Sequence, residues 1–154
     1  MSFSARSRYG TRALLELALQ GDAGPVSLET LARNQGMPPR YLSKIAQDLK
    51  RAGLVRSVRG ARGGYVMTRD PADIEIMDIV RAMDGSVALV DCVDDPAVCE
   101  RGEGCVTREL WGRVNEAMQD VLKSATLKGL VDKERARRRA VARASKVAKK
   151  RVSG

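Results

Sequence analysis

The chain has 154 residues, of which 44% are hydrophobic and only 3% aromatic, with three cysteines and no histidine. This length suits one domain with appended structure, and the composition favours a helical core of Leu, Val, Ile, Ala and Met. No apolar run approaches the ~18 residues of a membrane span, and the start lacks the apolar core of a secretory signal, so we expect a cytoplasmic protein with reduced thiols and no membrane partner.

The formal net charge of +9 is segregated along the chain. Residues 1–69 hold 12 Lys and Arg against 4 Asp and Glu, residues 70–132 hold 6 against 14, and residues 133–154 hold 10 against one. A basic N-terminal module predicts a polyanionic partner, because attraction to phosphates supplies much of nucleic-acid affinity. We take these three stretches as the expected domains.

The basic module begins with three helical patterns. The first covers residues 4–20 and carries an apolar stripe. The second covers residues 27–35, with Ser27 as its N-cap, and the third runs from Pro38 to a stop at Gly53. Two short helices joined by a tight glycine turn predict a helix-turn-helix.

Strand patterns follow the third helix. Residues 54–58 and 65–68 alternate in the manner of two paired strands, and a glycine-rich turn bearing Arg59 and Arg62 connects them. A basic β-hairpin in this place is a wing. The expected fold class is therefore mainly α with a small β-hairpin wing, a winged helix-turn-helix followed by a long C-terminal dimerisation helix.

The exposed start of the third helix and the wing hold the candidate DNA-binding residues. Arginine on guanine is the commonest specific base contact, so Arg40, Ser43 and Lys44 are candidates for reading base edges. Arg59 and Arg62 are candidates for phosphate or minor-groove contacts. The full predicted set is Arg8, Ser27, Pro39, Arg40, Tyr41, Ser43, Lys44, Arg59, Gly60 and Arg62.

All three cysteines fall in one acidic, glycine-containing segment, after a short amphipathic helix that ends at Gly85. Thiolates are the soft ligands that iron–sulfur clusters and zinc select, so the predicted metal ligands are Cys92, Cys99 and Cys105. A zinc or thiol-redox site and inert structural cysteines are the alternatives. Without histidine, a fourth ligand would be a backbone or solvent atom, a group from another subunit, or a loop carboxylate such as Glu100, Glu103 or Glu109.

Beyond the cysteine segment, apolar residues are spaced by three and four like the seam between two helices. They are Trp111, Val114, Met118, Val121 and Ala125. We expect self-association along this stripe, and packing on the chain's own core is the alternative. Residues 133–154 have only Ala and Val as apolar residues and should be disordered or a fraying helix, either an accessory DNA-binding tail or a solubilising end.

These residues together resemble the IscR/NsrR/CymR family of bacterial winged-helix regulators over residues 1–132. The matching stretches are Ser7-Arg8-Tyr9-Gly10, Tyr41-Leu42, Gly53-Leu54-Val55, Ser57-Val58-Arg59-Gly60, Gly63-Gly64-Tyr65 and Leu110-Trp111. The resemblance implies a homodimer that binds a palindromic operator in double-stranded DNA. In cluster-holding members it also implies a [2Fe-2S] or [4Fe-4S] iron–sulfur cluster on the three cysteines, whereas some relatives lack the cluster and sense through a partner protein.

Two positions depart from the family pattern. Arg108 stands where cluster-bearing IscR-type members have a histidine, and Arg8 stands where nitric-oxide-sensing members have an aspartate from the other subunit. The cluster's nuclearity and its fourth ligand therefore stay open.

The predicted function is a sequence-specific DNA-binding transcription regulator, a repressor, that senses redox, nitric oxide or iron–sulfur status through its cysteines. The alternatives are a cluster-free regulator controlled by a partner protein or thiol oxidation, and a zinc-stabilised DNA-binding protein. A constitutive nucleoid-type binder would leave the cysteine segment without a role. We do not expect an enzyme, because a cysteine nucleophile needs a base, most often histidine, and the glycine-rich turn lacks Walker spacing.

Overall fold

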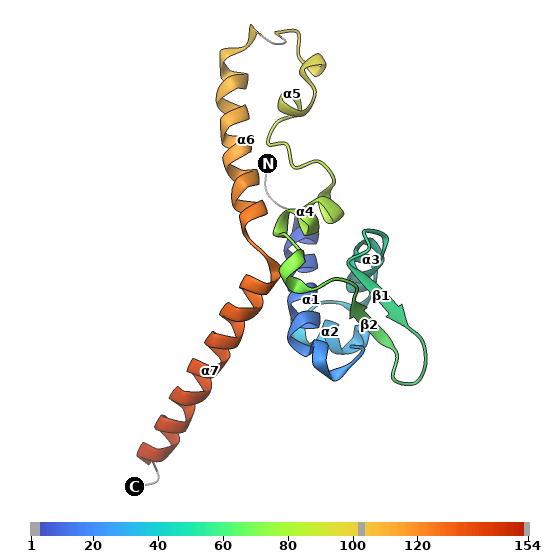
Figure 1. The fold of residues 1–154 in the computed structure, drawn as a ribbon, viewed down its shortest axis with the longest axis vertical. Coiled ribbons are helices and arrows are strands. Elements are labelled where there is room, and N and C mark those ends of the chain that lie inside the picture. Colours follow the sequence, from blue (N-terminus) through green and yellow to red (C-terminus); the bar gives the residue numbers. More distant parts are fainter. Residues whose placement is uncertain (1–3, 102–103, 153–154) are drawn as a thin grey trace.

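The computed structural model describes residues 4–101 and 104–152, and it is mainly helical with one β-hairpin (Figure 1). The elements are α1 (Ala5–Gln20), α2 (Leu28–Gln35), α3 (Pro39–Arg51), β1 (Val55–Val58), β2 (Gly64–Met67), α4 (Ile76–Asp84), α5 (Asp91–Asp94), α6 (Val106–Ser124) and α7 (Leu127–Val152). Short 3₁₀ turns lie at Gly21–Ala23, Pro71–Asp73 and Pro96–Val98. The predicted winged helix-turn-helix is thus confirmed.

Local capping chemistry sets the helix boundaries that the sequence predicts. The Ser27 hydroxyl accepts a hydrogen bond from the Thr30 amide at 3.1 Å and so caps the start of α2. Gly36 then ends α2 in the left-handed conformation, with φ of 62°, which glycine adopts without steric cost. Pro39 opens α3, where its missing amide donor is not needed.

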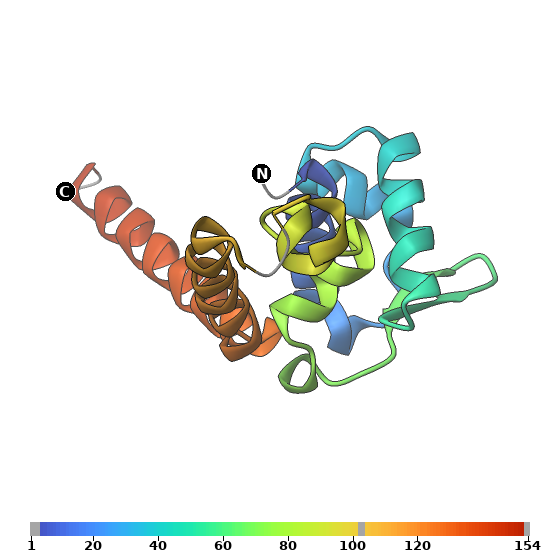
Figure 2. The same ribbon diagram turned by 90° about the horizontal axis from the view of Figure 1, so that it is seen from above.

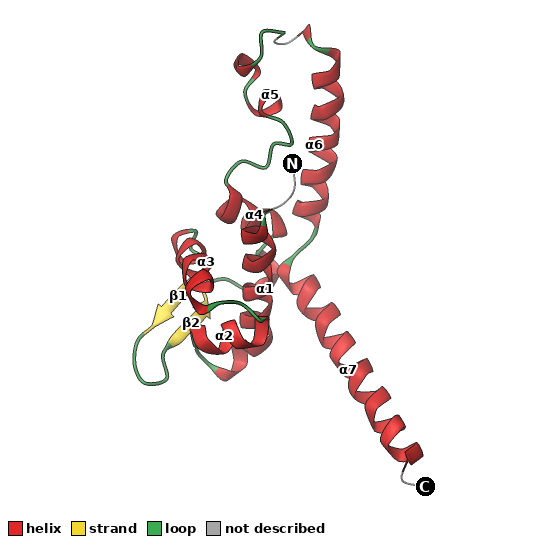
Figure 3. Cartoon of the chain, turned by 180° about the vertical axis from the view of Figure 1, so that it is seen from behind, coloured by secondary structure: helices red, strands yellow, loops and turns green. Residues whose placement is uncertain are grey.

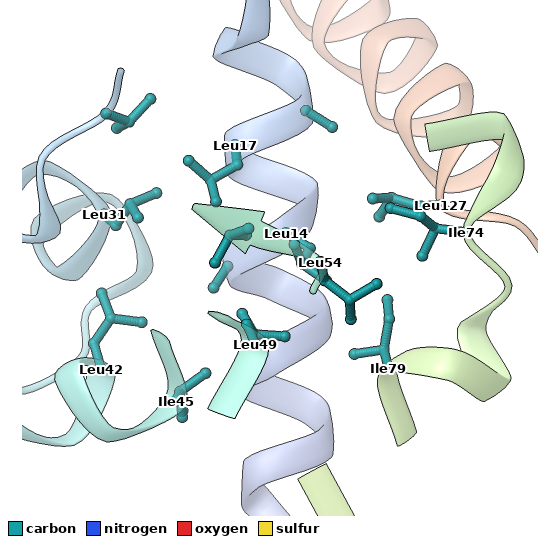
Figure 4. Close-up of a cluster of buried hydrophobic side chains, with 14 of the residues drawn as sticks. Leu14, Leu17, Leu31, Leu42, Ile45, Leu49, Leu54, Ile74, Ile79 and Leu127 are labelled. Atoms are coloured by element: carbon teal, nitrogen blue, oxygen red, sulfur yellow. The ribbon is translucent and has the colours of Figure 1, made fainter. Parts of the chain in front are cut away.

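The core is built around α1, with α2 and α3 packed on one side and α4 and the start of α7 on the other (Figure 4). Its largest fully buried side chains are Leu14, Leu31, Leu42, Ile45, Leu49, Leu54, Ile74, Met77, Ile79 and Leu127. Burial of each such side chain contributes roughly 1.5–3 kcal/mol. The helix-turn-helix, the wing and the first turns of α7 therefore form one packed body.

The wing is tied to the body through its second strand. Strands β1 and β2 pair antiparallel, and the Val26 amide donates to the Tyr65 carbonyl at 3.0 Å while the Tyr65 amide donates to the Val26 carbonyl at 2.8 Å. A Cβ atom on Gly64 would lie 2.3 Å from the Val26 carbonyl oxygen, so no side chain fits at this crossing. The loop before α2 therefore fixes the base of the wing.

Helix α6 ends and helix α7 begins at a short break at Ala125–Thr126, and the two helices extend to opposite sides of it (Figures 1 and 3). The Ile76 amide donates to the Ala125 carbonyl and the Leu127 amide donates to the Ile74 carbonyl, each at 2.9 Å. The end of α6 and the start of α7 are thus both bonded to the segment at the start of α4. None of the helices in the described ranges is long and apolar enough to cross a membrane.

Of the two alternatives for residues 133–154, disorder or a fraying helix, the structure shows a helix over the described residues 133–152. Helix α7 runs from Leu127 to Val152, so the expected boundary at residue 133 falls inside one helix. Composition alone did not decide between the alternatives because the helix is anchored at its start. Leu127 and Val131 are buried in the core, and Glu134 forms ion pairs with Arg137 and Arg138, so the costly first turns are already formed.

Candidate nucleic-acid interface and cysteine loop

The start of α3 presents a basic surface. Leu42, Ile45 and Leu49 face the core, and this amphipathic pattern turns Arg40 and Lys44 outward into solvent. Arg40 and Lys44 also line a shallow hollow together with Pro38 and Tyr41. Pro39 is exposed at the start of the helix, and Ser43 is half-buried beside this surface.

Tyr41 fixes α3 against α1. Its ring packs edge-on against Tyr9, with centroids 5.7 Å apart, and the Arg12 guanidinium lies 5.5 Å from the Tyr9 centroid. Arg12 Nε also donates to the Gln35 side chain at 2.9 Å, so the same group holds the end of α2. Tyr41 is half-buried, and its contact with Tyr9 positions α3 on α1.

Two polar links hold the far end of α3. Asp48, whose side chain is 12% exposed, binds Arg6 at 2.5 Å and Arg51 at 3.0 Å. Lys50 Nζ donates to the Ser57 hydroxyl of β1 at 3.2 Å. Because α3 is connected in this way to α1 and to the wing, the basic residues at its start have a fixed orientation.

The wing carries its arginines at the tip of the hairpin. Arg59, Gly60 and Arg62 are exposed, and the Gly63 amide donates to the Gly60 carbonyl at 2.9 Å to close the turn. Gly60 has φ of 118°, which favours glycine there. Figure 2 shows the hairpin projecting from the body next to α3. Strand and turn chemistry thus place two guanidinium groups beyond the recognition helix.

The remaining predicted residues lie at element starts. Arg8 is exposed in the second turn of α1, and the Ser27 hydroxyl is already used in capping α2 and in a 2.9 Å bond to the Thr30 hydroxyl. Gln47, which the predicted set does not include, is also exposed on α3, three residues after Lys44. The spacing of Arg40, Ser43, Lys44 and Gln47 by three, one and three residues marks one helix face and could have identified it.

The cysteine loop lies at the end of α6 remote from the wing (Figures 1 and 3). Cys92 lies in α5, Cys99 follows the 3₁₀ turn, and Cys105 directly precedes α6. All three are free thiols and half-buried. The loop therefore keeps the predicted cysteines close to the chain segments that enter α6.

The thiolate donor set suits an iron–sulfur cluster or zinc. Within residues 4–101 and 104–152, however, no three Cys, Asp or Glu side chains are placed to hold one metal ion. Of the predicted carboxylate ligands, Glu100 and Glu109 are exposed and Glu103 lies outside the described residues. The residue types fit a metal centre, but their described arrangement does not assemble one.

Two side chains of α6 hold the cysteine loop through its backbone. Arg108 Nε donates to the Cys92 carbonyl at 2.7 Å, and the buried Asn115 carboxamide oxygen accepts from the Leu89 amide at 3.1 Å. Arg108 therefore does not merely replace a histidine, since it connects the first cysteine to the helix that follows the last. A hollow of about 710 Å³ opens between these segments, with Cys105 and Arg108 in its wall.

The thiol of Cys105 has a distinct environment. The Thr107 hydroxyl, 3.1 Å from the sulfur, lowers the pKa of the Cys105 thiol by hydrogen bonding, and the Arg108 amide at the start of α6 acts in the same direction. The thiolate is the form that binds metals and attacks disulfides.

Helix α6 leaves an apolar face uncovered. Leu110, Trp111, Val114 and Val121 are 54%, 44%, 42% and 67% exposed. The helix packs on α4 at the edge of this face, where Leu122 meets the buried Met77 and Val80. The predicted stripe is thus helical, with Trp111, Val114 and Val121 exposed and Met118 half-buried.

Comparison with known proteins agrees with this geometry. Residues 3–133 match the Rrf2 family, described as an iron-dependent transcriptional regulator. The chain is 39% identical over 131 residues to protein rrf2 of Nitratidesulfovibrio vulgaris, covering 85% of this chain and 87% of that one. It is 34% identical over 134 residues to the HTH-type transcriptional regulator IscR of Escherichia coli, covering 87% and 82%. The structure of CymR, the global cysteine regulator of B. subtilis, superposes with a TM-score of 0.73 at 36% identity, covering 86% and 97%.

Proposed function

The chain belongs to the Rrf2 family of transcriptional regulators, and on that basis we propose that it is a homodimeric repressor whose operator affinity depends on chemistry at its three cysteines. DNA-binding transcription regulation follows from the family itself, and the protein is not an enzyme. The dimer, the palindromic operator, the repressor role and the cysteine chemistry are the proposed parts. Because its target is chromosomal DNA, we propose that it acts in the cytoplasm.

The exposed basic start of α3 beside the wing carries the DNA-reading part of the proposal. In a dimer, two copies of α3 would enter major grooves ~34 Å apart, which matches a palindromic site. Arg40 would read a base edge, with Ser43 and Lys44 beside it. Arg59 and Arg62 would contact phosphates or the minor groove.

Two arginine variants test this assignment on a palindromic duplex selected by the protein from a random library. Arg62→Ala should weaken binding to the selected and scrambled duplexes alike, because a phosphate contact carries no sequence information. Arg40→Ala should also reduce the preference for the selected duplex, at a cost of about 1–3 kcal/mol. Equal affinity of the wild type for both duplexes would reject sequence-specific regulation in favour of a nucleoid-type binder.

The proposed sensor is an iron–sulfur cluster, [2Fe-2S] or [4Fe-4S], held by Cys92, Cys99 and Cys105. Support comes from the three thiols in one loop, from the iron-dependent description of the family and from the position of the loop on α6. When bound, a cluster of this kind supplies a centre that oxygen or nitric oxide can alter. The chain's own contribution is to hold the loop on α6 through Arg108 and Asn115.

Anaerobic purification, followed by iron and sulfide analysis and an absorption spectrum, tests the cluster. We expect iron and sulfide in the wild type and neither in a variant with the three cysteines changed to serine. We also expect this variant to differ from the wild type in operator affinity. A colourless, iron-free wild type that binds its operator as the serine variant does would end the sensor proposal.

A cluster-free regulator is the second candidate, and one contact favours it. Arg108 stands at the position where cluster-bearing family members have a histidine. Its Nε donates to the Cys92 carbonyl, and this hydrogen bond closes the loop without any metal. Regulation would then come from a partner protein or from thiol oxidation. Reversible loss of operator binding on treatment of iron-free protein with an oxidant, absent from the serine variant, would identify thiol oxidation.

A further inference from the structure

Helix α7 continues beyond residue 133, where the family match ends, as a strongly basic extension. Residues 133–154 hold ten Lys and Arg and a single acid, Glu134. The extension is not loosely attached, because α7 begins in the core with Leu127 and Val131 buried. What this charged helix binds is not accounted for by the winged helix or by the cysteine loop.

An ion network fixes the rotation of α7 about its own axis. The buried Glu16 of α1, 4% exposed, accepts from Asn34 Nδ2 at 2.8 Å and from the Arg138 guanidinium at 3.4 Å. Glu134 accepts from Arg137 and Arg138 at 2.8 Å, and these bonds lower its pKa to about 2. One face of the extension is thereby turned toward α1.

Four basic side chains share a different face of α7. Arg135, Arg139, Arg143 and Lys146 are spaced by four, four and three residues and are all exposed. Within residues 4–101 and 104–152, none of the four forms an ion pair with an acid. At 1.5 Å per residue, this basic stripe is about 16 Å long.

Only the start of the stripe lies near the base of the wing. Arg135 and Lys128, seven residues apart on one face, line a hollow together with Tyr65–Met67 of β2 and the acids Asp70 and Asp132. Beyond Arg135, α7 continues away from the body (Figures 1 and 2). The rest of the stripe therefore projects from the DNA-binding module.

We propose that the basic stripe of α7 is a second contact to the phosphate backbone of DNA. The proposal rests on the proposed function, since the duplex held by α3 and the wing is the polyanion that the stripe would contact. Guanidinium and ammonium groups on an exposed helix bind phosphates through charge and carry no base preference. The stripe should therefore add affinity and salt dependence without changing the operator sequence.

A pair of variants with equal charge tests the stripe on the full chain. Arg139→Gln/Arg143→Gln removes two charges from the stripe, and Lys133→Gln/Arg137→Gln removes two charges, also four residues apart, from another face of α7. Binding to the library-selected duplex and to its scrambled form is measured at salt concentrations between about 50 and about 200 mM, which gives the dependence of affinity on salt.

For the stripe variant, the slope of log affinity against log salt should be shallower by about 1.8, because binding without two phosphate contacts releases fewer counterions. Its affinity should be at least about tenfold lower on both duplexes. The control variant should keep the wild-type slope. Equal changes in both variants, or an unchanged slope in the stripe variant, would overturn the proposal. Lost preference of the wild type for the selected duplex would instead count against the proposed regulator, since the stripe is judged on the slope alone.

Discussion

The close crossing of the wing and the loop before α2 gives a sharp test of how the DNA-binding surface is held together. Gly64→Ala would add a Cβ atom 2.3 Å from the Val26 carbonyl oxygen and 2.4 Å from its carbon. Both are backbone atoms, so no side chain can move aside to relieve the clash. We expect the hairpin to separate from Val26 while its two strands stay paired.

The cost follows from the bonds that are lost. The two Val26–Tyr65 backbone bonds, at 3.0 and 2.8 Å, each contribute about 0.5–1.5 kcal/mol, so the free energy of unfolding should fall by about 1–3 kcal/mol. Gly21→Ala is the matched control, because nothing lies within 4 Å of a Cβ atom there and its φ of −54° is helical. That variant should be neutral or more stable by about 0.4–1 kcal/mol.

Urea unfolding followed by circular dichroism measures both changes, and DNA binding provides the functional readout. A displaced wing moves Arg59 and Arg62, so Gly64→Ala should also weaken binding to all duplexes. If Gly64→Ala unfolds within about 0.5 kcal/mol of the wild type and binds DNA as tightly, the reasoning from this crossing is refuted.

Three further predictions concern α6, Glu16 and α7. Met118→Glu on the apolar face of α6 should abolish self-association in sedimentation velocity, whereas Lys123→Glu on another face should not. A dimer that persists in Met118→Glu would show that the interface lies elsewhere. Glu16→Gln should lower the free energy of unfolding by about 1–3 kcal/mol, because the amide keeps only one of the two buried oxygens that accept from Asn34 and Arg138. The exposed Glu29→Gln should change it by less than about 0.5 kcal/mol, and equal effects would contradict this view of the network. The pKa of Glu134 is about 2 against an ordinary 4.5, so its stabilisation of α7 is complete above pH 4.5 and lost as pH falls toward 2. The helical circular dichroism signal of the wild type should therefore fall more over this range than that of Glu134→Gln. Identical pH curves for the two proteins would argue against this role of Glu134.

Much of the fold could be predicted from the sequence because local signals coincide with element ends. Ser27, Gly36 and Pro39 set boundaries through capping and backbone chemistry that acts within four residues. The pairing of β1 with β2 was foreseen for the same reason, since a glycine-rich turn and alternating residues are local features.

Contacts between distant residues account for what the sequence left open. Arg138 of α7 contacts Glu16, more than a hundred residues away, and composition carries no record of that contact. The third pairing at Val26 and the link from Arg108 to Cys92 likewise join segments that no local pattern relates. For the site, exposed basic residues on α3 and the capping role of Ser27 could be predicted from local patterns, whereas the packing role of Tyr41 needed coordinates.

The break between α6 and α7 leaves α6 as a long arm that is attached to the DNA-binding module near its C-terminal end. The two helices meet at the short bridge from Glu75 to Thr126, whose neighbour Ile74 is fully buried in the core of the DNA-binding module. Helix α6 has 19 residues, so its arm from the pivot to the cysteine end is about 28 Å long. A displacement of about 2 Å at the cysteine end then corresponds to a rotation of α6 by roughly 4° about the Glu75–Thr126 bridge. A displacement at the cysteine end would therefore reach the DNA-binding module as a change in the angle of α6, and a longer helix would give a smaller angle for the same displacement.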